Sequence, residues 1–493
     1  MRNSIVYSCL VAFFLLAVAN VSAAQPPDSL WHRTLGGDQP DYGRSVGEVG
    51  GGYIAAGFSR SFGGIDYDMY LVRTDENGDT LWARTYGGAD DDLANSVRPT
   101  SDGGFIIAGY TKSFGAGGSD FYLVKTDSDG DTMWTRTHGG RGEDYAYGVC
   151  QGPRGGYLVA GYSDSYSNDN DFLLIKTDAS GDSIWIRTYG GSGDDYCFGF
   201  DRTADGGCVL VGSSNSFSTP DSDILIVKTD ADGDSLWMRT DGSSGNDCGY
   251  SVEQTADGGY IVAGTAYLAD GSGNQAYLRK VFSTGAFFWS KAYGGSGYEI
   301  AFDVEQLPSD CGYIACGYTT SCGGGQEDIY LLRTGADGDT VWTGAYGDSL
   351  REWGHEVQQT ADGGFIIAGS AMSYPPPAGD NLYLLKTGAD PAGIYNPAGA
   401  DNDGLFLAAI PNPSPAGITI AYHLPRPCRV SIAVFDLMGR EVQELTCSKA
   451  GPGDHRVYWD ACDHAGFRVA PGVYFCRIEA GGVSGTSKLV IAK

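Results

Sequence analysis

Positive charge, histidine and long apolar runs are all scarce in this sequence. Lys and Arg number 32 against 61 Asp and Glu, and 6 His are present, so the formal net charge is −29 at pH 7. Such an acidic chain repels phosphate backbones and anionic lipid surfaces, which excludes nucleic acid as an expected partner. Beyond the N-terminus no apolar run approaches the ~20 residues of a membrane helix, so we expect no membrane span in the mature chain.

Familiar catalytic and metal-binding patterns are also missing. No C-x-x-C pair, H-E-x-x-H motif or phosphate-binding P-loop occurs, so the sequence signals neither a zinc site nor nucleotide hydrolysis. Long helical patterns are absent, whereas 76 Gly and 31 Tyr favour turns and strands. We therefore expect an all-β protein.

The N-terminus has the features of a secretory signal peptide. Residues 1–24 contain one basic residue, Arg2, then an apolar segment over 5–18 and a small-residue exit at 21–23. This order is typical of a cleaved signal. Cleavage would leave 11 of the 12 cysteines, an odd number, so export could pair some of them but not all.

A repeat of about 52 residues runs through most of the chain. Each copy contains four short apolar segments between Gly-rich turns, as in YLVAGYS and DFLLIKTD, and such segments suit blades that are covered on both faces. The pattern predicts a seven-bladed β-propeller over residues 28–390. The clearest marker is a tryptophan that recurs every 51 to 53 residues: Trp31, Trp82, Trp134, Trp185, Trp237, Trp289 and Trp342.

The two ends of this array complement each other. The first copy begins at DSLW with only a final strand, and the last copy stops at NLYLLKT without one. We expect the strand at 29–35 to complete the blade begun by residues 353–387, which would close the ring and hide the edges of an open sheet.

Acidic turns such as TDADGDSLW (residues 229–237) raise the question of calcium. Three aspartates alternate there like calcium ligands, but an EF-hand loop needs Gly at its sixth position, where Ser235 stands. The equivalent turn FSTGAFFW keeps Gly285 and has no Asp. Because Gly supplies the positive φ of a tight hairpin, we interpret these turns as structural, with calcium possible but not favoured.

A second series consists of acids ten residues after each repeat tryptophan. Each stands in the loop that enters the innermost strand, so the seven should form a ring on one face of the propeller. Equivalent side chains in every blade favour a structural role, the capping of backbone N–H groups in the Gly-rich loop, over the alternative of a cation or ligand site. The acids are Asp41, Asp92, Asp144, Asp195, Asp247, Glu299 and Glu352.

A third series is basic and lies opposite the tryptophans in the predicted hairpins. We expect each basic side chain to cover the tryptophan ring with its stem or to make a cation–π contact. The series is Arg73, Lys125, Lys176, Lys228, Lys280, Arg333 and Lys386.

The repeat is most clearly altered in the last blade. Its REWGHE segment places Arg351, Glu352, Trp353 and His355 at the channel mouth, and the following loop adds Tyr374. Such a cluster could hold a sugar ring against Trp353. The alternative is a closure blade whose contacts differ because the chain ends meet there.

These repeats, with units such as DGGYIVAG, DIYLLRTG and GDTVW, resemble the β-propeller repeats of secreted bacterial and archaeal proteins. More distantly, they resemble the Trp-bearing blades of pyrroloquinoline quinoproteins. The resemblance implies a fold rather than a chemistry, because propellers host enzymes, lectins and scaffolds alike. The chain has seven repeats instead of the quinoproteins' eight and no adjacent Cys-Cys pair, so we expect no such cofactor.

The composition changes after Thr387. A Gly, Pro and Asp linker (391–404) leads to a unit at 405–493 whose alternating apolar residues predict a small β-sandwich. PNP, FDLMGREV, VYWD, GVYF and KLVIAK occur there in order. They resemble the C-terminal sorting domain of type IX secretion substrates and the related immunoglobulin-like domain of flagellar hook-capping proteins. The resemblance implies that 405–493 engages the type IX export machinery and brings the chain to the outer-membrane surface or the medium of a Gram-negative bacterium.

Two classes of function fit these observations. The first is a non-enzymatic propeller that acts as a scaffold or binds a glycan or protein through its top face. The alternative is an exported polysaccharide hydrolase or lyase that uses the acids of that face. In a sevenfold ring every acid has equivalent neighbours, so no pair of carboxylates is singled out for glycoside chemistry. We therefore expect the binding module and name no catalytic residue.

Overall fold

The computed structural model describes residues 24–391 and 406–491 apart from short gaps. The segments left out are 1–23, 63, 153–154, 218–220, 244, 269–272, 373–378, 392–405, 411–416, 425–427, 437–439, 452, 465, 481–482 and 492–493. The predicted signal peptide and Tyr374 lie outside the described residues. Among those that are described, no helix has the length and apolarity to span a membrane.

Seven antiparallel sheets of four strands follow one another along the chain. From the inner to the outer strand, they are β2 (Asp41–Val49), β3 (Gly52–Ser59), β4 (Asp68–Thr74) and β5 (Thr80–Tyr86); β6 (Asp92–Pro99), β7 (Phe105–Thr111), β8 (Asp120–Thr126) and β9 (Thr132–His138); β10 (Asp144–Gln151), β11 (Tyr157–Ser163), β12 (Asp171–Thr177) and β13 (Ser183–Tyr189); β14 (Asp195–Arg202), β15 (Cys208–Ser214), β16 (Asp223–Thr229) and β17 (Ser235–Asp241); β18 (Cys248–Gln254), β19 (Tyr260–Leu268), β20 (Gly273–Val281) and β21 (Phe287–Tyr293); β22 (Glu299–Gln306), β23 (Tyr313–Thr319), β24 (Asp328–Thr334) and β25 (Thr340–Tyr346); and β26 (Glu352–Gln359), β27 (Phe365–Met372), β28 (Asp380–Thr387) and β1 (Ser29–Leu35).

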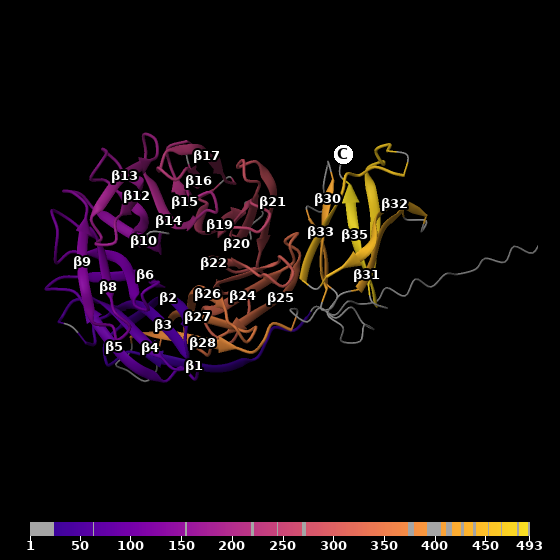
Figure 1. Cartoon of the computed structure of the whole chain (residues 1–493). Helices are drawn as coiled ribbons and strands as arrows, with labels where there is room; N and C mark the ends of the chain where they lie inside the picture. The colour runs from indigo at the N-terminus through magenta and orange to yellow at the C-terminus, as the bar shows by residue number, and fades with distance from the viewer. Residues whose placement is uncertain are drawn as a thin grey trace, which may run out of the picture.

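The sheets are the blades of a propeller, which confirms the predicted fold class. Their inner strands β2, β6, β10, β14, β18, β22 and β26 contact one another in a closed ring, and Figure 1 shows the blades around a common centre. The middle strands are covered on both faces: every residue of β8 is buried, whereas the outer strand β9 has no buried residue. Apolar contacts between blades therefore hold the ring together.

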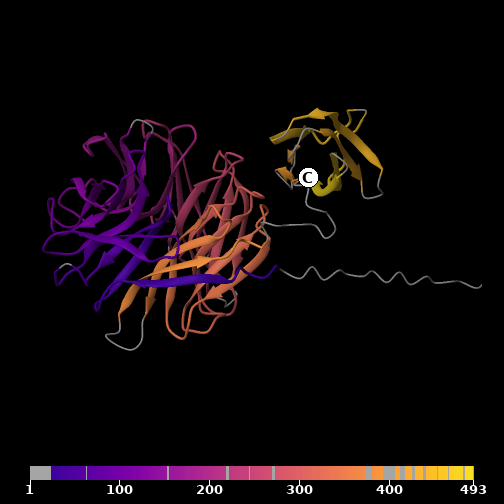
Figure 2. The ribbon, with the colours of Figure 1, turned by 60° about the horizontal axis from the view of Figure 1, so that its bottom comes forward.

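The last blade is completed by the first strand of the chain. β1 pairs with β28, with Trp31 opposite Lys386 and Leu35 opposite Leu382, and Figure 2 shows the indigo β1 beside the orange end of the propeller. Leu35 also belongs to an apolar cluster that joins the first blade to β27 and β28. Strand pairing and packing thus close the ring at the same place.

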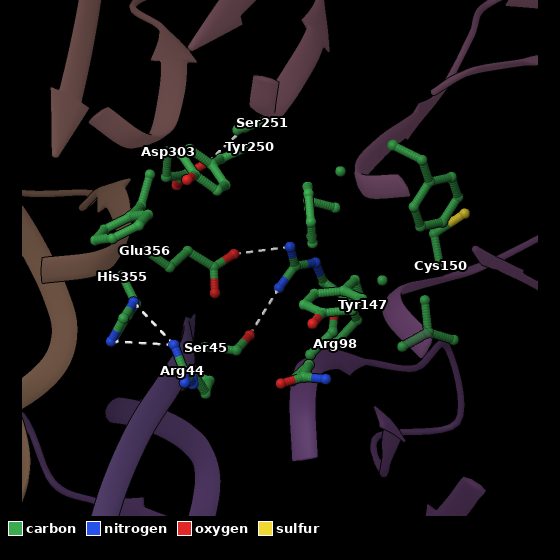
Figure 3. A pocket seen from close by; sticks show the side chains of 18 of the residues that line it. Arg44, Ser45, Arg98, Tyr147, Cys150, Tyr250, Ser251, Asp303, His355 and Glu356 are labelled. Atoms are coloured by element: carbon green, nitrogen blue, oxygen red, sulfur yellow. Dashed lines mark hydrogen bonds and ion pairs between the residues drawn. The ribbon is translucent and has the colours of Figure 1, made fainter. Parts of the chain in front are cut away.

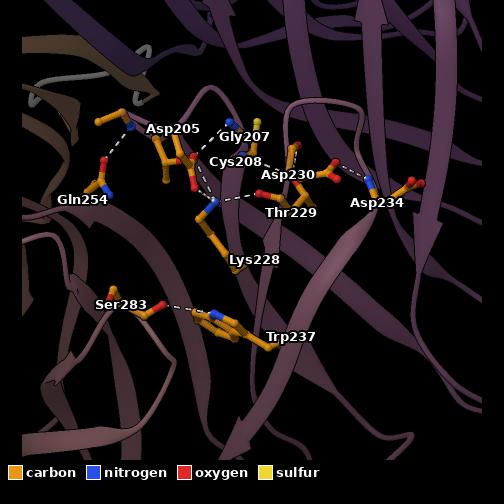
Figure 4. Close-up of polar contacts among 12 residues, drawn as sticks. Asp205, Gly207, Cys208, Lys228, Thr229, Asp230, Asp234, Trp237, Gln254 and Ser283 are labelled. Carbon is orange, nitrogen blue, oxygen red and sulfur yellow. Dashed lines mark hydrogen bonds and ion pairs between the residues drawn. The ribbon is translucent and has the colours of Figure 1, made fainter.

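The acidic turns are hairpins, as predicted. In the turn between β16 and β17 the Asp230 carboxylate accepts hydrogen bonds from the N–H groups of Asp232 and Asp234, both at 2.9 Å. Figure 4 shows the bond between Asp230 and Asp234. Gly233 has a φ of +81° and Gly285, in the turn without Asp, has +74°. Glycine at this position is needed for the left-handed conformation, because other residues adopt it at a cost.

The register predicted for the basic series is confirmed, and of the two alternative contacts expected there the cation–π contact occurs at one member. Each basic residue lies opposite a repeat tryptophan, as Lys228 does opposite Trp237. Within the series only Lys176 lies over that ring, at 5.7 Å from the Trp185 centroid. Lys228 instead donates to Asp205 (2.8 Å) and to a backbone carbonyl (2.6 Å) (Figure 4).

Five of the seven basic side chains form an ion pair with an acid from the turn between the first and second strands of their blade. Four lysine or arginine residues besides Lys228 also pair with an acid of that turn: Lys125 with Asp102, Lys280 with Asp257, Arg333 with Asp310 and Lys386 with Asp362. In the blade of Lys176 this turn has the sequence QGPRGG, without an acid. Lys176, without such a carboxylate, lies over the tryptophan and donates to the carbonyl of Ala231 at 3.2 Å. Arg73, whose turn also lacks an acid, donates to the carbonyl of Gly50 at 2.7 Å.

The C-terminal unit consists of two facing sheets. One contains β29 (Phe406–Ile410), β30 (Ile418–Leu424) and β33 (Gly453–Trp459); the other contains β31 (Cys428–Asp436), β32 (Glu441–Ala450), β34 (Gly472–Ala480) and β35 (Val483–Ile491). Ile420 and Trp459 of the first sheet share a core with Ile432 and Ile478 of the second. This is a β-sandwich, and its immunoglobulin-like topology stays a prediction. None of the ten described cysteines of the chain is in a disulfide.

Candidate ligand-binding site

The inner strands enclose a pocket of about 430 Å³ in the central channel (Figure 3). This volume is within the range of ligand-binding pockets. Each blade contributes to the lining the residue three positions after its ring acid. These seven residues are of five types: Arg44, Asn95, Tyr147, Phe198, Tyr250, Phe302 and His355. The repeat gives these residues equivalent positions in the seven blades, whereas the residue type at that position differs between blades.

One side of the pocket is an aromatic arc formed by Tyr147, Phe198, Tyr250 and Phe302. Ring centroids of successive members are 5.2, 5.7 and 5.2 Å apart, and the first and last contacts are edge-to-face. His355 continues the arc at 5.1 Å from Phe302. Such pairs stabilise each other and present a fixed apolar wall to the channel.

Arg44 and Asn95 lie at the other side of the ring. The Arg44 Nη1 atom is 3.2 Å from both ring nitrogens of His355, and a neutral imidazole accepts a hydrogen bond at one of them. Burial, and then the charge of Arg44, lower the pKa of His355 well below its usual value. His355 is therefore a neutral partner that leaves the positive charge of Arg44 uncompensated.

The carboxylates of the pocket are already engaged. Glu356 forms an ion pair with Arg98 at 2.7 Å and accepts the N–H of Val46 at 2.8 Å. Asp303 accepts hydrogen bonds from Ser251 (2.7 Å) and from the backbone of the next blade (3.0 Å). Burial, and then the charge of Glu356, raise the pKa of Asp303 to about 6. These acids connect neighbouring inner strands.

A serine in this pocket also matches a catalytic motif that was missed at the level of sequence. Residues 43–47 read GRSVG, the letters of the G-x-S-x-G nucleophile motif, which requires an exposed Ser on a strand-to-helix turn. Ser45 lies instead within β2 and is buried. Its hydroxyl accepts hydrogen bonds from the backbone of Val97 (3.0 Å) and from Arg98 (3.1 Å), so it joins two blades and is not placed as a nucleophile.

The predicted cluster of the last blade is split by the structure. Arg351 donates to Asp380 at 2.9 Å, and its guanidinium lies 4.9 Å from the Trp353 ring. Trp353 also stacks on Tyr318 at 5.5 Å and is half-buried. Of the predicted residues that are described, His355 lines the pocket. Sugar stacking on Trp353 stays a prediction.

The seven acids of the ring, Glu352 among them, cap their own loops, as the structural interpretation predicted. All are buried, and Asp144 accepts the N–H of Gly140 (2.9 Å) and the hydroxyl of Ser165 (2.7 Å). In every blade the acid accepts the N–H four residues before it: that of Gly37, Gly88, Gly140, Gly191, Ser243, Gly295 or Asp348. A cation site at these acids stays a hypothesis, and within the described residues no group of three metal-ligating side chains occurs.

A second acid series, visible in the sequence but not recognised there, faces the first. It stands 24 residues before the ring acid, at the start of the third strand. Asp68 and Asp92 meet at Gly87, where an added Cβ would lie 1.9 and 2.6 Å from their oxygens. The other pairs are Asp120 with Asp144, Asp171 with Asp195, Asp223 with Asp247 and Asp328 with Glu352, while Gln275 replaces the acid beside Glu299. Burial, and then the charge of Asp92, raise the pKa of Asp68.

Comparison with known proteins identifies the C-terminal unit and gives more distant similarities for the rest. Residues 408–492 match the family described as the secretion system C-terminal sorting domain, which confirms the predicted sorting domain. The chain is therefore a secreted or cell-surface protein. The regulatory protein FlaEY of Caulobacter vibrioides is 28% identical over 167 residues, which are 29% of this chain and 18% of that protein.

Two solved structures are similar at low sequence identity. One is PorZ, a surface component of the type IX secretion system of Porphyromonas gingivalis, at 15% identity and a TM-score of 0.39 over 91% of this chain and 59% of PorZ. The other is Sqt1 from Chaetomium thermophilum, at 12% identity and a TM-score of 0.42 over 80% of this chain and 97% of that one.

Proposed function

We propose that this chain is a non-enzymatic, exported binding module. Its sorting domain delivers it to the cell surface or the medium, and its propeller holds a saccharide in the channel pocket. The observation that supports this best is the asymmetry of the pocket, because seven equivalent positions carry an aromatic arc on one side and Arg44 with Asn95 on the other. Packing alone would be satisfied by one residue type in every blade, whereas ligand sites combine apolar surface with a few placed polar groups.

A saccharide suits this lining. A sugar ring has apolar C–H faces, which the rings of Phe198 and Tyr250 can cover, and hydroxyls, which need polar partners. Asn95 donates its amide N–H to a backbone carbonyl at 2.8 Å, so its own carbonyl oxygen can accept from a ligand hydroxyl.

A glycan array with the purified mature chain, residues 25–493, tests this function. We expect retention of at least one class of saccharide without release of shortened products. Phe198→Ala should weaken retention by about tenfold, the equivalent of ~1.4 kcal/mol, while Phe217→Ala, at an exposed loop phenylalanine, should leave it unchanged. No retention of any saccharide would contradict the proposal.

A second candidate is a polysaccharide-acting enzyme, and the carboxylates Asp303 and Glu356 favour it. Their environments differ: the pKa of Asp303 is raised to about 6, whereas Glu356 is paired with Arg98. Glycosidases use a proton donor with a raised pKa beside an ionised carboxylate. Product release from the array that disappears in Glu356→Gln would favour this enzyme over the binding module.

A further inference from the structure

We propose that the channel pocket selects saccharides that carry a carboxylate, such as uronic acids, and that Arg44 binds this group. This inference rests on the proposed function, because it assumes that a saccharide occupies the pocket. It adds the chemical class of the ligand and the residue that recognises it.

Arg44 has unused capacity for a ligand. A guanidinium has five N–H donors, yet its polar contact in the structure is to the neutral His355, and its Nε has no hydrogen-bond partner among the described residues. Its guanidinium also lies 5.6 Å from the Phe58 ring centroid. The group is held in position by neighbours that carry no negative charge.

The setting of Arg44 is unusual for so acidic a chain. Asp and Glu outnumber Lys and Arg by 61 to 32, and Arg98 in the same pocket is neutralised by Glu356 at 2.7 Å. Among the described residues, the Arg44 guanidinium has its hydrogen-bond contact with His355 and forms no ion pair with a carboxylate. Arg44 is half-buried, and a cation removed from water without a counter-charge is costly, so a ligand carboxylate would provide the negative partner that the chain itself lacks at this position.

The shape of the pocket separates the two parts of such a ligand. The fork of an arginine matches a carboxylate with two parallel hydrogen bonds. In the ring of inner strands, β2 with Arg44 lies opposite β14 with Phe198 and β18 with Tyr250. A sugar ring against the arc would therefore direct its carboxylate toward Arg44. A neutral sugar would fill the same space and leave the guanidinium unpaired.

Calorimetric titration of the mature chain with oligogalacturonate and with its carboxyl-reduced, neutral counterpart tests the inference. We expect the acidic oligosaccharide to bind at least about tenfold more tightly. Arg44→Gln should abolish this preference and Arg44→Lys should retain part of it, because lysine keeps the charge without the fork. Arg239→Gln, at an exposed arginine, should bind like the parent, and melting curves establish that each variant is folded.

The outcomes separate this inference from the proposed function. Equal affinity for the acidic and the reduced oligosaccharide, with loss of both in Phe198→Ala, would overturn the role of Arg44 and leave a neutral saccharide site. A preference for the acidic form that persists in a folded Arg44→Gln chain would also overturn it. Absence of binding by either oligosaccharide would overturn the inference, and only failure of the whole glycan array would overturn the proposed function as well.

Discussion

At the scale of single residues, many carboxylates of the propeller accept hydrogen bonds from the chain's own backbone. Asp230 accepts two N–H groups within one hairpin, and Asp144 accepts one N–H of the loop that leads into β10. Glycine-rich loops expose backbone donors that strands cannot satisfy, and short acidic side chains supply the acceptors. Part of the excess of acidic residues therefore serves to accept backbone hydrogen bonds in the turns.

The ring acids give a prediction that distinguishes a cap from a cation ligand. Asp144→Ala removes the acceptor of the Gly140 N–H and should lower the free energy of unfolding by about 1–2 kcal/mol. If Asp144 is a cap, the loss of stability in Asp144→Ala should be the same in thermal melts with calcium and with a chelator. Asp129→Ala, at an exposed turn position, is the control. A calcium-dependent rise in the parent's melting temperature that Asp144→Ala abolishes would instead show cation binding.

The facing acids predict a dependence of stability on pH. Because the pKa of Asp68 is raised in the folded chain, the folded state binds a proton that the unfolded state has already released. The resulting loss of folding stability is absent below the pKa of about 3.9 that Asp has in the unfolded chain. It grows as the pH rises through the higher pKa of Asp68 in the folded chain. Asp68→Asn removes the repulsion from Asp92, so the variant should gain stability relative to the parent between pH 4 and pH 8.

Denaturant melts across this pH range measure the effect. The blade with Gln275 beside Glu299 already has an amide in the equivalent place, which shows that the junction accepts one. Asp232→Asn, at an exposed turn residue, should follow the parent at every pH. A constant difference between Asp68→Asn and the parent would contradict a raised pKa of Asp68 in the folded chain.

At the scale of elements, the repeat made the strands predictable. The hydrogen-bond and ion-pair partners of many side chains could not be predicted, because they lie in turns outside the same hairpin. The spacing of tryptophans fixed the hairpin register, so Lys228 opposite Trp237 could be expected. Its ion pair could not, because Asp205 lies 23 residues earlier in a turn of a different hairpin. Contacts within one hairpin follow from local sequence, but contacts across strands require the sheet to be assembled.

The closing strand β1 is the element whose loss should matter most. Deletion of residues 25–36 removes the partner of β28 and exposes its edge, together with part of the apolar cluster around Leu35. We expect a broadened unfolding transition and aggregation that increases with protein concentration. Calorimetry and light scattering measure both. A deletion variant that melts as sharply as the parent would show that β1 does not close the ring.

At the scale of the whole molecule, the pocket was the part that sequence could predict least. His355 was recognised because REWGHE departs from the repeat, but Arg44 lies in an ordinary-looking first blade, 311 residues away. The two meet only when the ring closes between β2 and β26, which contact each other. A site formed by one residue from each of seven blades has no local motif, although counting three positions from each ring acid would have listed its members.

The sorting domain gives the prediction for the whole chain. In a host with type IX machinery, a chain that ends at Asp401 lacks the residues that match the sorting family, 408–492. We expect it to accumulate in the periplasm, whereas the full chain reaches the surface or the medium, as fractionation and surface protease digestion can measure. The propeller has its own closed ring and core, distinct from the core of the C-terminal sandwich. The truncated chain should therefore keep the propeller's melting curve, so that misfolding does not explain its retention. Equal surface levels of the two chains would show that 405–493 is not needed for export.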